Sequence, residues 1–193
     1  MAQVTSTISE ARTRLLETAG RLFYAEGLHS VGVDRILAEA KVTRATMYRH
    51  FAGKEDLVLA YLAEADQATR HHVEAGVKAA TTDADAVRAV AKGIAMHING
   101  QGFRGCAFLN AVAEYADPAH PVHQAVLAHR QWFLDTVTEL LARVGDGPAE
   151  LDGRHFVMLR DGAMAAGCLT DPGPIGDTLC EAVEGILRAR TSG

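Results

Sequence analysis

A cluster of cationic side chains lies in the first third of the chain, in a stretch without Asp or Glu. Its members are Lys41, Arg44, Arg49 and Lys54, and His50 lies in the same stretch. Guanidinium and ammonium groups bind anions, and Arg can donate two parallel hydrogen bonds to one planar acceptor edge. Phosphate groups and guanine edges are such acceptors. These residue types at this spacing therefore indicate a surface that contacts nucleic acid.

The charge of the whole chain makes this cluster informative. The formal net charge is −5 at pH 7. Residues 1–60 carry eight Lys or Arg and seven Asp or Glu, whereas residues 61–193 carry eleven and seventeen. An acidic protein as a whole repels a phosphate backbone, so binding to it needs a local cationic face. The alternative is an ordinary solvated charged helix.

Two short helices are expected to position these side chains. One helical face of residues 33–40 is apolar, with Val33, Ile36, Leu37 and Ala40. The following residues leave room only for a tight turn, after which Thr43 can cap a second helix over residues 44–51. Met47 and Phe51 form the inward pair of that helix. Two short helices joined by such a turn predict a helix-turn-helix, whose second helix enters the major groove of DNA.

The residues around this motif resemble the TetR family of bacterial transcriptional regulators. The resemblance is carried by Tyr48-Arg49-His50-Phe51 followed by Lys54, within a frame that covers about the first 60 residues. The frame consists of Leu15, Leu16, Ala19, Leu22, Phe23, Gly27, Val33, Asp34, Ile36, Ala40, Val42 and Leu57. Two positions depart from the family pattern. Lys41 stands where a turn glycine is usual, so a left-handed backbone there carries some strain. Gly32 stands where a Thr or Ser often caps the second helix.

The resemblance implies an all-α fold of about nine helices. A three-helix, helix-turn-helix DNA-binding domain is expected at residues 1–55, and a helical ligand-binding and dimerisation domain at residues 56–193. The implied function is sequence-specific transcriptional regulation by a homodimer. We expect a repressor that a small-molecule ligand releases from a palindromic operator.

The resemblance and the chemistry of the side chains together predict the DNA contacts. The expected contact residues are Thr43, Arg44, Ala45, Thr46, Tyr48, Arg49, His50 and Lys54. Arg44 is the candidate for a bidentate contact to guanine, with a plain phosphate contact as the alternative. Tyr48 and His50 are expected to reach phosphates. Lys54 opens the next helix, where its ammonium and the helix amides can hold one phosphate together.

Bulk composition bounds the class of protein. Hydrophobic residues make up 48% of the chain, and the mean hydropathy is +0.02. No apolar stretch is long enough to span a bilayer, and the first residues lack the apolar block of a signal peptide, so we expect a cytoplasmic protein. The three cysteines, at positions 106, 168 and 180, have no metal-ligand spacing and fit reduced thiols.

Apolar periodicity, caps and breaks predict the helices along the chain. The residues Thr7-Ile8-Ser9-Glu10 form a possible capping box for a first helix that ends near Glu26. After the helix-turn-helix, further helices are expected at residues 54–79, 82–99, 106–116, 121–144, 149–169 and 175–190. Pro121 lies just inside one of these starts.

The last two helices are expected to form the dimer interface. Ile175, Leu179, Ala182 and Ile186 recur at helical spacing, and the small residues of 161–167, including Ala163 and Ala166, allow close helix approach. In the resembled family two such helices from each subunit form a four-helix bundle. Packing within one chain is the alternative.

The resemblance also implies a ligand pocket in the body. On a helix, Cys106, Asn110 and Glu114 share one face, with Phe108 on the neighbouring face. Further candidate lining residues are Met96, Trp132, Phe133 and Met158. The alternative role for Asn110 and Glu114 is to satisfy helix ends and loop amides, while the aromatic and methionine side chains are equally typical of a core.

Three other interpretations remain open at this point. Cys106 at a helix start beside Arg104 fits a thiol-based redox or electrophile sensor on the same DNA-binding scaffold. The second interpretation is a DNA-binding dimer that senses no ligand. A small helical enzyme is the third, but no nucleophile elbow, phosphate-binding glycine loop or metalloprotease motif is present, so no enzyme is expected. His71-His72 and His120-x-x-His123 lack companion ligands at a characteristic spacing, so neither a metal nor a cofactor is expected.

Overall fold

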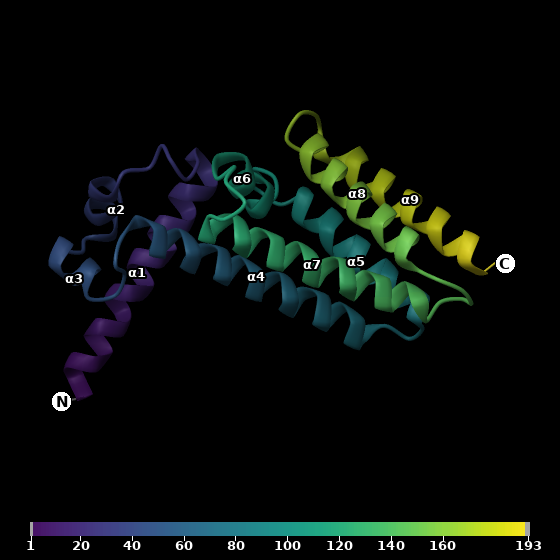
Figure 1. The fold of residues 1–193 in the computed structure, drawn as a ribbon, viewed down its shortest axis with the longest axis horizontal. Coiled ribbons are helices and arrows are strands. Elements are labelled where there is room, and N and C mark those ends of the chain that lie inside the picture. The colour runs from purple at the N-terminus through teal and green to yellow at the C-terminus, as the bar shows by residue number, and fades with distance from the viewer. Residues whose placement is uncertain (1, 192–193) are drawn as a thin grey trace. The chain divides into compact units, whose positions relative to one another are not determined.

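The computed structural model describes residues 2–191, with side chains described from Glu10 onward. Within that range the chain forms nine α-helices and no strand (Figure 1), which confirms the predicted all-α class. The helices are α1 (Ala2–Glu26), α2 (Val33–Ala40), α3 (Arg44–Tyr48), α4 (Lys54–Ala79), α5 (Asp83–Ile98), α6 (Ala107–Glu114), α7 (Pro121–Ala142), α8 (Glu150–Ala166) and α9 (Pro172–Thr191). None of them, over the described residues, is long and apolar enough to cross a membrane.

The chain folds into two compact units that are discontinuous in sequence. The first unit contains the residues up to Ala65 together with Ala107–Val126, and the second contains Asp66–Cys106 together with the residues from Leu127 onward. The first unit therefore differs from the expected domain 1–55, because α6 and the start of α7 fold with the N-terminal helices.

The core of the first unit is built on the apolar stripe of α1. Leu15, Ala19 and Leu22 are fully buried there, and Ile36 of α2 and Met47 of α3 are fully buried as well. The predicted inward face of the helix-turn-helix is thus confirmed, including Phe51, which is 4% exposed. Burying this stripe stabilises two helices that are too short to persist alone.

The core of the second unit forms where α5, α8 and α9 pack together. The buried residues are Val87, Val90, Ala91, Ile94 and Ile98 of α5, Phe156, Val157 and Met164 of α8, and Leu179, Val183 and Leu187 of α9. Phe133, Val137 and Leu141 of α7 are also buried. The spacing of each set follows the 3.6-residue period of a helix.

The turn between α2 and α3 shows how the missing glycine is accommodated. Lys41 adopts φ 53° and ψ 46°, and it is the one non-glycine residue with positive φ in the described chain. Its N–H bonds to the carbonyl of Ala38 at 3.3 Å, and the N–H of Val42 bonds to that of Leu37 at 3.1 Å. These bonds satisfy carbonyls at the end of α2 and hold Lys41 in the left-handed region, as predicted.

Some predicted helix ends differ from the structure. The helix α1 begins at Ala2, so the predicted capping box at residues 7–10 lies inside the helix rather than at its start. The helix α3 ends at Tyr48 rather than Phe51, because the amides of His50 and Phe51 both bond to the carbonyl of Met47, at 2.8 and 2.9 Å. These bonds close the chain into a turn.

The predicted end of α8 and the predicted start of α9 also differ from the structure. The helix α8 ends at Ala166 rather than Leu169, and α9 begins at Pro172 rather than Ile175. Proline suits the first helical position, where its missing N–H costs nothing. Asp171 supports that start, since its Oδ1 accepts a hydrogen bond of 3.2 Å from the N–H of Gly173.

Candidate nucleic-acid interface

The recognition helix α3 is started by a threonine cap. The Oγ1 of Thr43 accepts a hydrogen bond of 3.2 Å from the N–H of Thr46, as the sequence predicts, while Gly32 gives α2 no side-chain cap. Arg49 donates to Thr46 Oγ1 at 2.9 Å. The cap fixes where α3 begins, and so it fixes which side chains its first turn presents.

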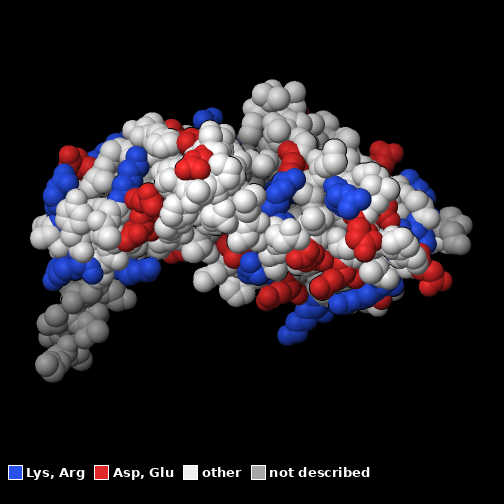
Figure 2. Space-filling model, in the orientation of Figure 1, with Lys and Arg blue, Asp and Glu red and all other residues white. Residues whose placement is uncertain are grey.

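Most of the predicted contact residues are exposed on this short helix and its flanks. Thr43, Arg44, Ala45, Tyr48 and Arg49 are exposed, and the exposed fraction of Tyr48 is 53% although it is a large aromatic residue. Figure 2 shows Lys and Arg side chains at the end of the first unit that carries α2 and α3. The folded chain therefore keeps the cationic cluster on an accessible surface.

Arg44 is held by two neighbours in the absence of DNA. Its guanidinium forms an ion pair with Asp34 of α2. A hydrogen bond with Tyr48 and then the charge of Asp34 raise the pKa of Arg44. Sequence analysis did not single out Asp34 as its partner, although an acid in the first turn of α2 is a visible signal.

Lys54 and His50 are placed differently from the exposed cluster. The ammonium of Lys54 donates to the carbonyl of His29 at 3.1 Å, and burial lowers the pKa of Lys54 while the carboxylate of Glu114 acts in the opposite direction. The Nε2 of His50 is buried and has no hydrogen-bond partner among the described residues. In the first turn of α4, the carboxylate of Asp56 accepts a hydrogen bond of 2.7 Å from the N–H of Ala52.

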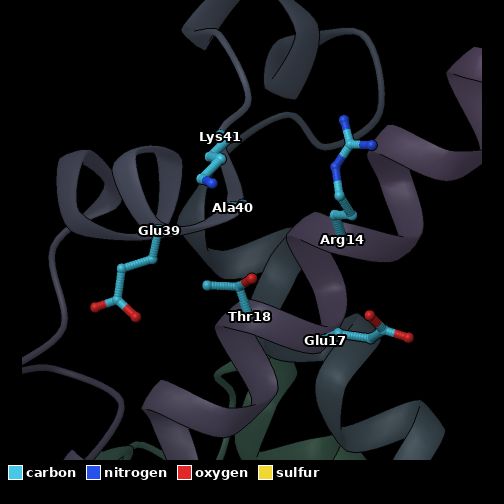
Figure 3. Close-up of a pocket in the computed structure, with 6 residues that line it drawn as sticks. All are labelled: Arg14, Glu17, Thr18, Glu39, Ala40 and Lys41. Carbon is cyan, nitrogen blue, oxygen red and sulfur yellow. The ribbon is translucent and has the colours of Figure 1, made fainter.

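A polar hollow of about 400 Å³ lies beside the helix-turn-helix. It is lined by Arg14, Glu17 and Thr18 of α1 and by Glu39, Ala40 and Lys41 at the end of α2 (Figure 3). Basic and acidic side chains are present in equal number, so the hollow favours neither an anion nor a cation.

The predicted ligand residues are divided between the two units. Phe108, Asn110 and Glu114 belong to the first unit, whereas Met96, Cys106, Trp132, Phe133 and Met158 belong to the second. Met96 is 75% exposed and Met158 is 67% exposed, so the structure places both on the surface. Glu114 accepts hydrogen bonds from loop amides, the alternative role expected for it.

The second unit contains a polar cluster that sequence analysis missed. Asp66 accepts a hydrogen bond of 2.6 Å from Arg70 Nε and lies 2.6 Å from His129 Nδ1. Arg70 also lies over the ring of Trp132, 4.1 Å from its centroid. Burial acts to raise the pKa of Asp66, but the bonds to Arg70 and His129 lower it overall. The four-residue spacing of Asp66 and Arg70 is the sequence signal that could have predicted their contact. His129 lies on α7, far from both of them in the sequence.

Cys106 lies beside a buried arginine of the second unit. Arg160 is 8% exposed, donates to Cys106 Sγ at 3.2 Å and to Asp161 at 2.8 Å, and lies 5.4 Å from the ring centroid of Phe133. Burial acts to lower the pKa of Arg160, but Cys106 and Asp161 raise it overall. The predicted cationic neighbour of Cys106 was Arg104, which is exposed.

The predicted interface residues divide between the interior and the surface. Ala163 is 9% exposed and Leu179 is 2% exposed, so both are already covered within the chain. The remaining four, Ala166, Ile175, Ala182 and Ile186, are half-buried. Gly167, in the small-residue stretch, has no room for a Cβ, because Ile98 Cγ2 would lie 2.7 Å from it. Gly167 thus serves close packing inside the second unit, whereas Gly162 of the same stretch lies in open space.

Known proteins that are similar to this chain point to DNA binding, as the exposed recognition helix does. Residues 15–61 match the model of the bacterial regulatory proteins of the tetR family. The structure of SCO4454, a TetR-family transcriptional regulator from Streptomyces coelicolor, is 66% identical and superposes with a TM-score of 0.93, covering 94% of this chain and 96% of that one.

Two curated relatives are more distant. The HTH-type transcriptional regulator LmrA of Bacillus subtilis is 25% identical over 126 residues, 64% of this chain and 67% of LmrA. The HTH-type transcriptional activator FasR of Mycolicibacterium smegmatis is 40% identical over 53 residues, 28% of this chain and 24% of FasR. With the near full-length match to SCO4454 and the exposed, capped recognition helix, this chain belongs to the TetR family of DNA-binding transcriptional regulators.

Proposed function

We propose that this chain is a homodimeric repressor that binds a near-palindromic operator and is released from it by a small-molecule effector. The observation that carries the proposal is the exposed α3, with Arg44, Tyr48 and Arg49 presented by the Thr43 cap. Side chains of these types contact base edges and phosphates in the major groove.

A dimer is proposed because one recognition helix of five residues reads too few base pairs. A twofold dimer reads two half-sites and matches a palindrome. The surface of α8 supports a self-complementary interface, since Leu151 is 56% exposed and Met158 is 67% exposed. Leu169, just beyond α8, is 82% exposed. These apolar side chains, more than the buried Ala163 and Leu179, are available to a second copy.

The test is selection from random duplex DNA with the purified protein at moderate salt. We expect a palindrome whose half-sites lie about one helical turn apart. Light scattering at micromolar protein should report a dimer. Salt-sensitive binding without a consensus would reject sequence-specific recognition, and a monomer bound to a single half-site would reject the dimer.

The effector is proposed to act on the second unit, where aromatic and polar side chains are interleaved. Trp132 and Phe133 lie beside Arg70, His129 and Arg160, a composition that suits a ligand with an apolar body and a few polar groups. An effector changes operator affinity only if it prefers one conformation of the dimer to another. Compounds that weaken operator binding should therefore also raise the melting temperature of the free protein.

A second candidate function is sensing of electrophiles through Cys106. The guanidinium of Arg160 contacts its sulfur at 3.2 Å, and the thiol is 4% exposed. With iodoacetamide as the probe, the thiolate sulfur bonds to the probe's carbon and iodide leaves. Loss of operator binding in the wild type, absent in Cys106→Ser, would support sensing. Intact binding after complete alkylation would reject it.

A further inference from the structure

The turn that connects α1 to α2 is held by a carboxylate from a distant part of the chain. Gly27 begins the turn with φ 96°, which an L side chain rarely adopts. Glu114, the last residue of α6, then accepts two backbone amides: Oε1 bonds to the N–H of Leu28 at 2.7 Å and Oε2 to that of His29 at 2.6 Å. Each carboxylate oxygen therefore satisfies one amide of the turn.

The same carboxylate is connected to the start of α4. His29 Nδ1 lies 3.2 Å from Glu114 Oε2, and the His29 ring stacks on Tyr115 with centroids 4.6 Å apart. The carbonyl of His29 accepts a hydrogen bond of 3.1 Å from the ammonium of Lys54. Glu114 thus holds the amide of His29, while the carbonyl of the same residue holds Lys54.

A second contact joins the two segments of the first unit close to this one. His120 Nε2 lies 3.3 Å from the carboxylate of Glu55, and its ring lies 4.6 Å from that of Tyr115. His123 Nδ1 lies 2.7 Å from the carbonyl of Tyr115. These contacts fix the segment that follows Glu114, so the carboxylate is presented to the turn from a well-supported position.

We propose that Glu114 is a positioning residue for operator binding, which holds the α1–α2 turn and Lys54 in the arrangement that presents the helix-turn-helix to DNA. The inference rests on the proposed operator-binding function. Glu114 touches no DNA in this role and acts through the turn.

The chemistry of the site explains why a carboxylate is needed. Two amide donors converge on the two oxygens of one side chain. In Glu114→Gln one oxygen becomes an NH2 group, which cannot accept a hydrogen bond and faces an N–H donor. Loss of a hydrogen bond to a charged acceptor corresponds to about tenfold in an equilibrium constant, or more.

The test compares Glu114→Gln with Glu17→Gln, a matched control on the exposed surface of α1 in the same unit. Both variants remove one negative charge, which by electrostatics alone should strengthen binding to any DNA. If Glu114 positions the turn, Glu114→Gln should instead weaken binding to the operator. We expect Glu114→Gln to bind the selected operator about tenfold more weakly than Glu17→Gln at the same salt concentration.

A readout of specificity separates positioning from a general loss of folded protein. Binding of Glu114→Gln to an unrelated duplex of equal length should fall by a smaller factor than its binding to the operator, each relative to Glu17→Gln, so the ratio of specific to non-specific affinity falls. A merely structural role would lower both affinities together. Equal operator affinity of the two variants would overturn the proposal.

Amide hydrogen exchange of the wild type keeps the proposal testable if Glu114→Gln fails to fold. The amides of Leu28 and His29 should be protected at neutral pH, and rapid exchange at both positions would show that Glu114 does not hold the turn. Failure of the wild type to select any operator would instead reject the proposed function, while the exchange experiment would still report on the Glu114 contact.

Discussion

The guanidinium of Arg44, in the recognition helix, forms an ion pair with the carboxylate of Asp34, ten residues earlier in the first turn of α2. The two side chains are 52% and 85% exposed. Ion pairs between side chains as exposed as these stabilise a protein very little, so a guanine edge or a phosphate can replace Asp34 at little cost. In the free protein Asp34 nevertheless limits the positions that the Arg44 side chain samples.

Arg44→Ala should relax sequence preference at one base pair of each half-site. A bidentate contact to guanine accounts for about 1–3 kcal/mol of discrimination, and Ala cannot supply it. The measurement is operator affinity for a set of single-base variants, with Arg49→Ala, directly after the end of the helix, as the comparison. A uniform loss across all sequences would identify Arg44 as a phosphate contact instead.

Lys54→Ala should weaken binding to all duplexes and flatten the salt dependence. Each phosphate neutralised contributes about 0.9 to the slope of log affinity against log salt on duplex DNA. Lys78→Ala, at the exposed far end of α4, is the control and should leave the slope unchanged. If Lys54→Ala lowers affinity without changing the slope, its ammonium acts on the His29 carbonyl rather than on a phosphate.

The free energy of unfolding should fall as pH is lowered through about 6.5, the usual pKa of histidine. Burial, with the charges of Arg160 and Arg70, lowers the pKa of His129, and the opposing effect of Asp66 does not offset it. The unfolded chain therefore takes up this proton at a higher pH than the folded chain does, and stability declines towards acid. A single site changes the slope by at most about 1.4 kcal/mol per pH unit.

Denaturant titrations between pH 7.5 and 5.5 check this expectation. His129→Gln should be less stable at pH 7.5 yet less dependent on pH, since it lacks the titrating ring. His71→Gln, at an exposed position of α4, should keep the pH dependence of the wild type. A pH dependence unchanged in His129→Gln would contradict the assignment. The depressed pKa of Asp66 adds a further loss only below about pH 4.

Gly153→Ala should destabilise the second unit by about 1–3 kcal/mol. A Cβ at Gly153 would lie 3.1 Å from Thr138 Cβ and would clash with its hydroxyl. Gly93→Ala is the matched control, because a Cβ there meets nothing within 4 Å. In that open position of α5 the substitution should raise stability by about 0.5–1 kcal/mol. Melting temperatures that shift in the same direction in both variants would contradict this account of α8 packing.

The local signals of the sequence were sufficient to predict that the chain is helical and how its helix-turn-helix is capped and turned. Val33–Ala40 is the helix that its apolar spacing predicts, and the Thr43 cap and the left-handed Lys41 are as expected. Each of these features depends on residues within one or two turns. The predicted contacts of Arg44 and its neighbours with DNA stay predictions, because the free chain does not test them.

Helical periodicity cannot predict which residues far apart in the sequence contact each other. Glu114 meets Leu28 across 86 residues, and His129 meets Asp66 across 63. A helical pattern shows which face is polar but not which distant polar group satisfies it. The exposed Met158 illustrates the same limit, since an apolar residue at helical spacing fits a pocket, a core or an interface equally well.

The discontinuity of the first unit has a consequence for the order of folding. The chain leaves this unit after Ala65 and returns to it at Ala107, so a ribosome must synthesise most of α4, all of α5 and the following loop before Glu114 exists. Until then the amides of Leu28 and His29 have only water as a partner. Closing so long a loop is entropically costly, and contacts of large sequence separation form slowly. The DNA-reading helices of a nascent chain therefore complete their assembly only after α6 has emerged, and a fragment that ends at Ala65 lacks the carboxylate that holds their first turn.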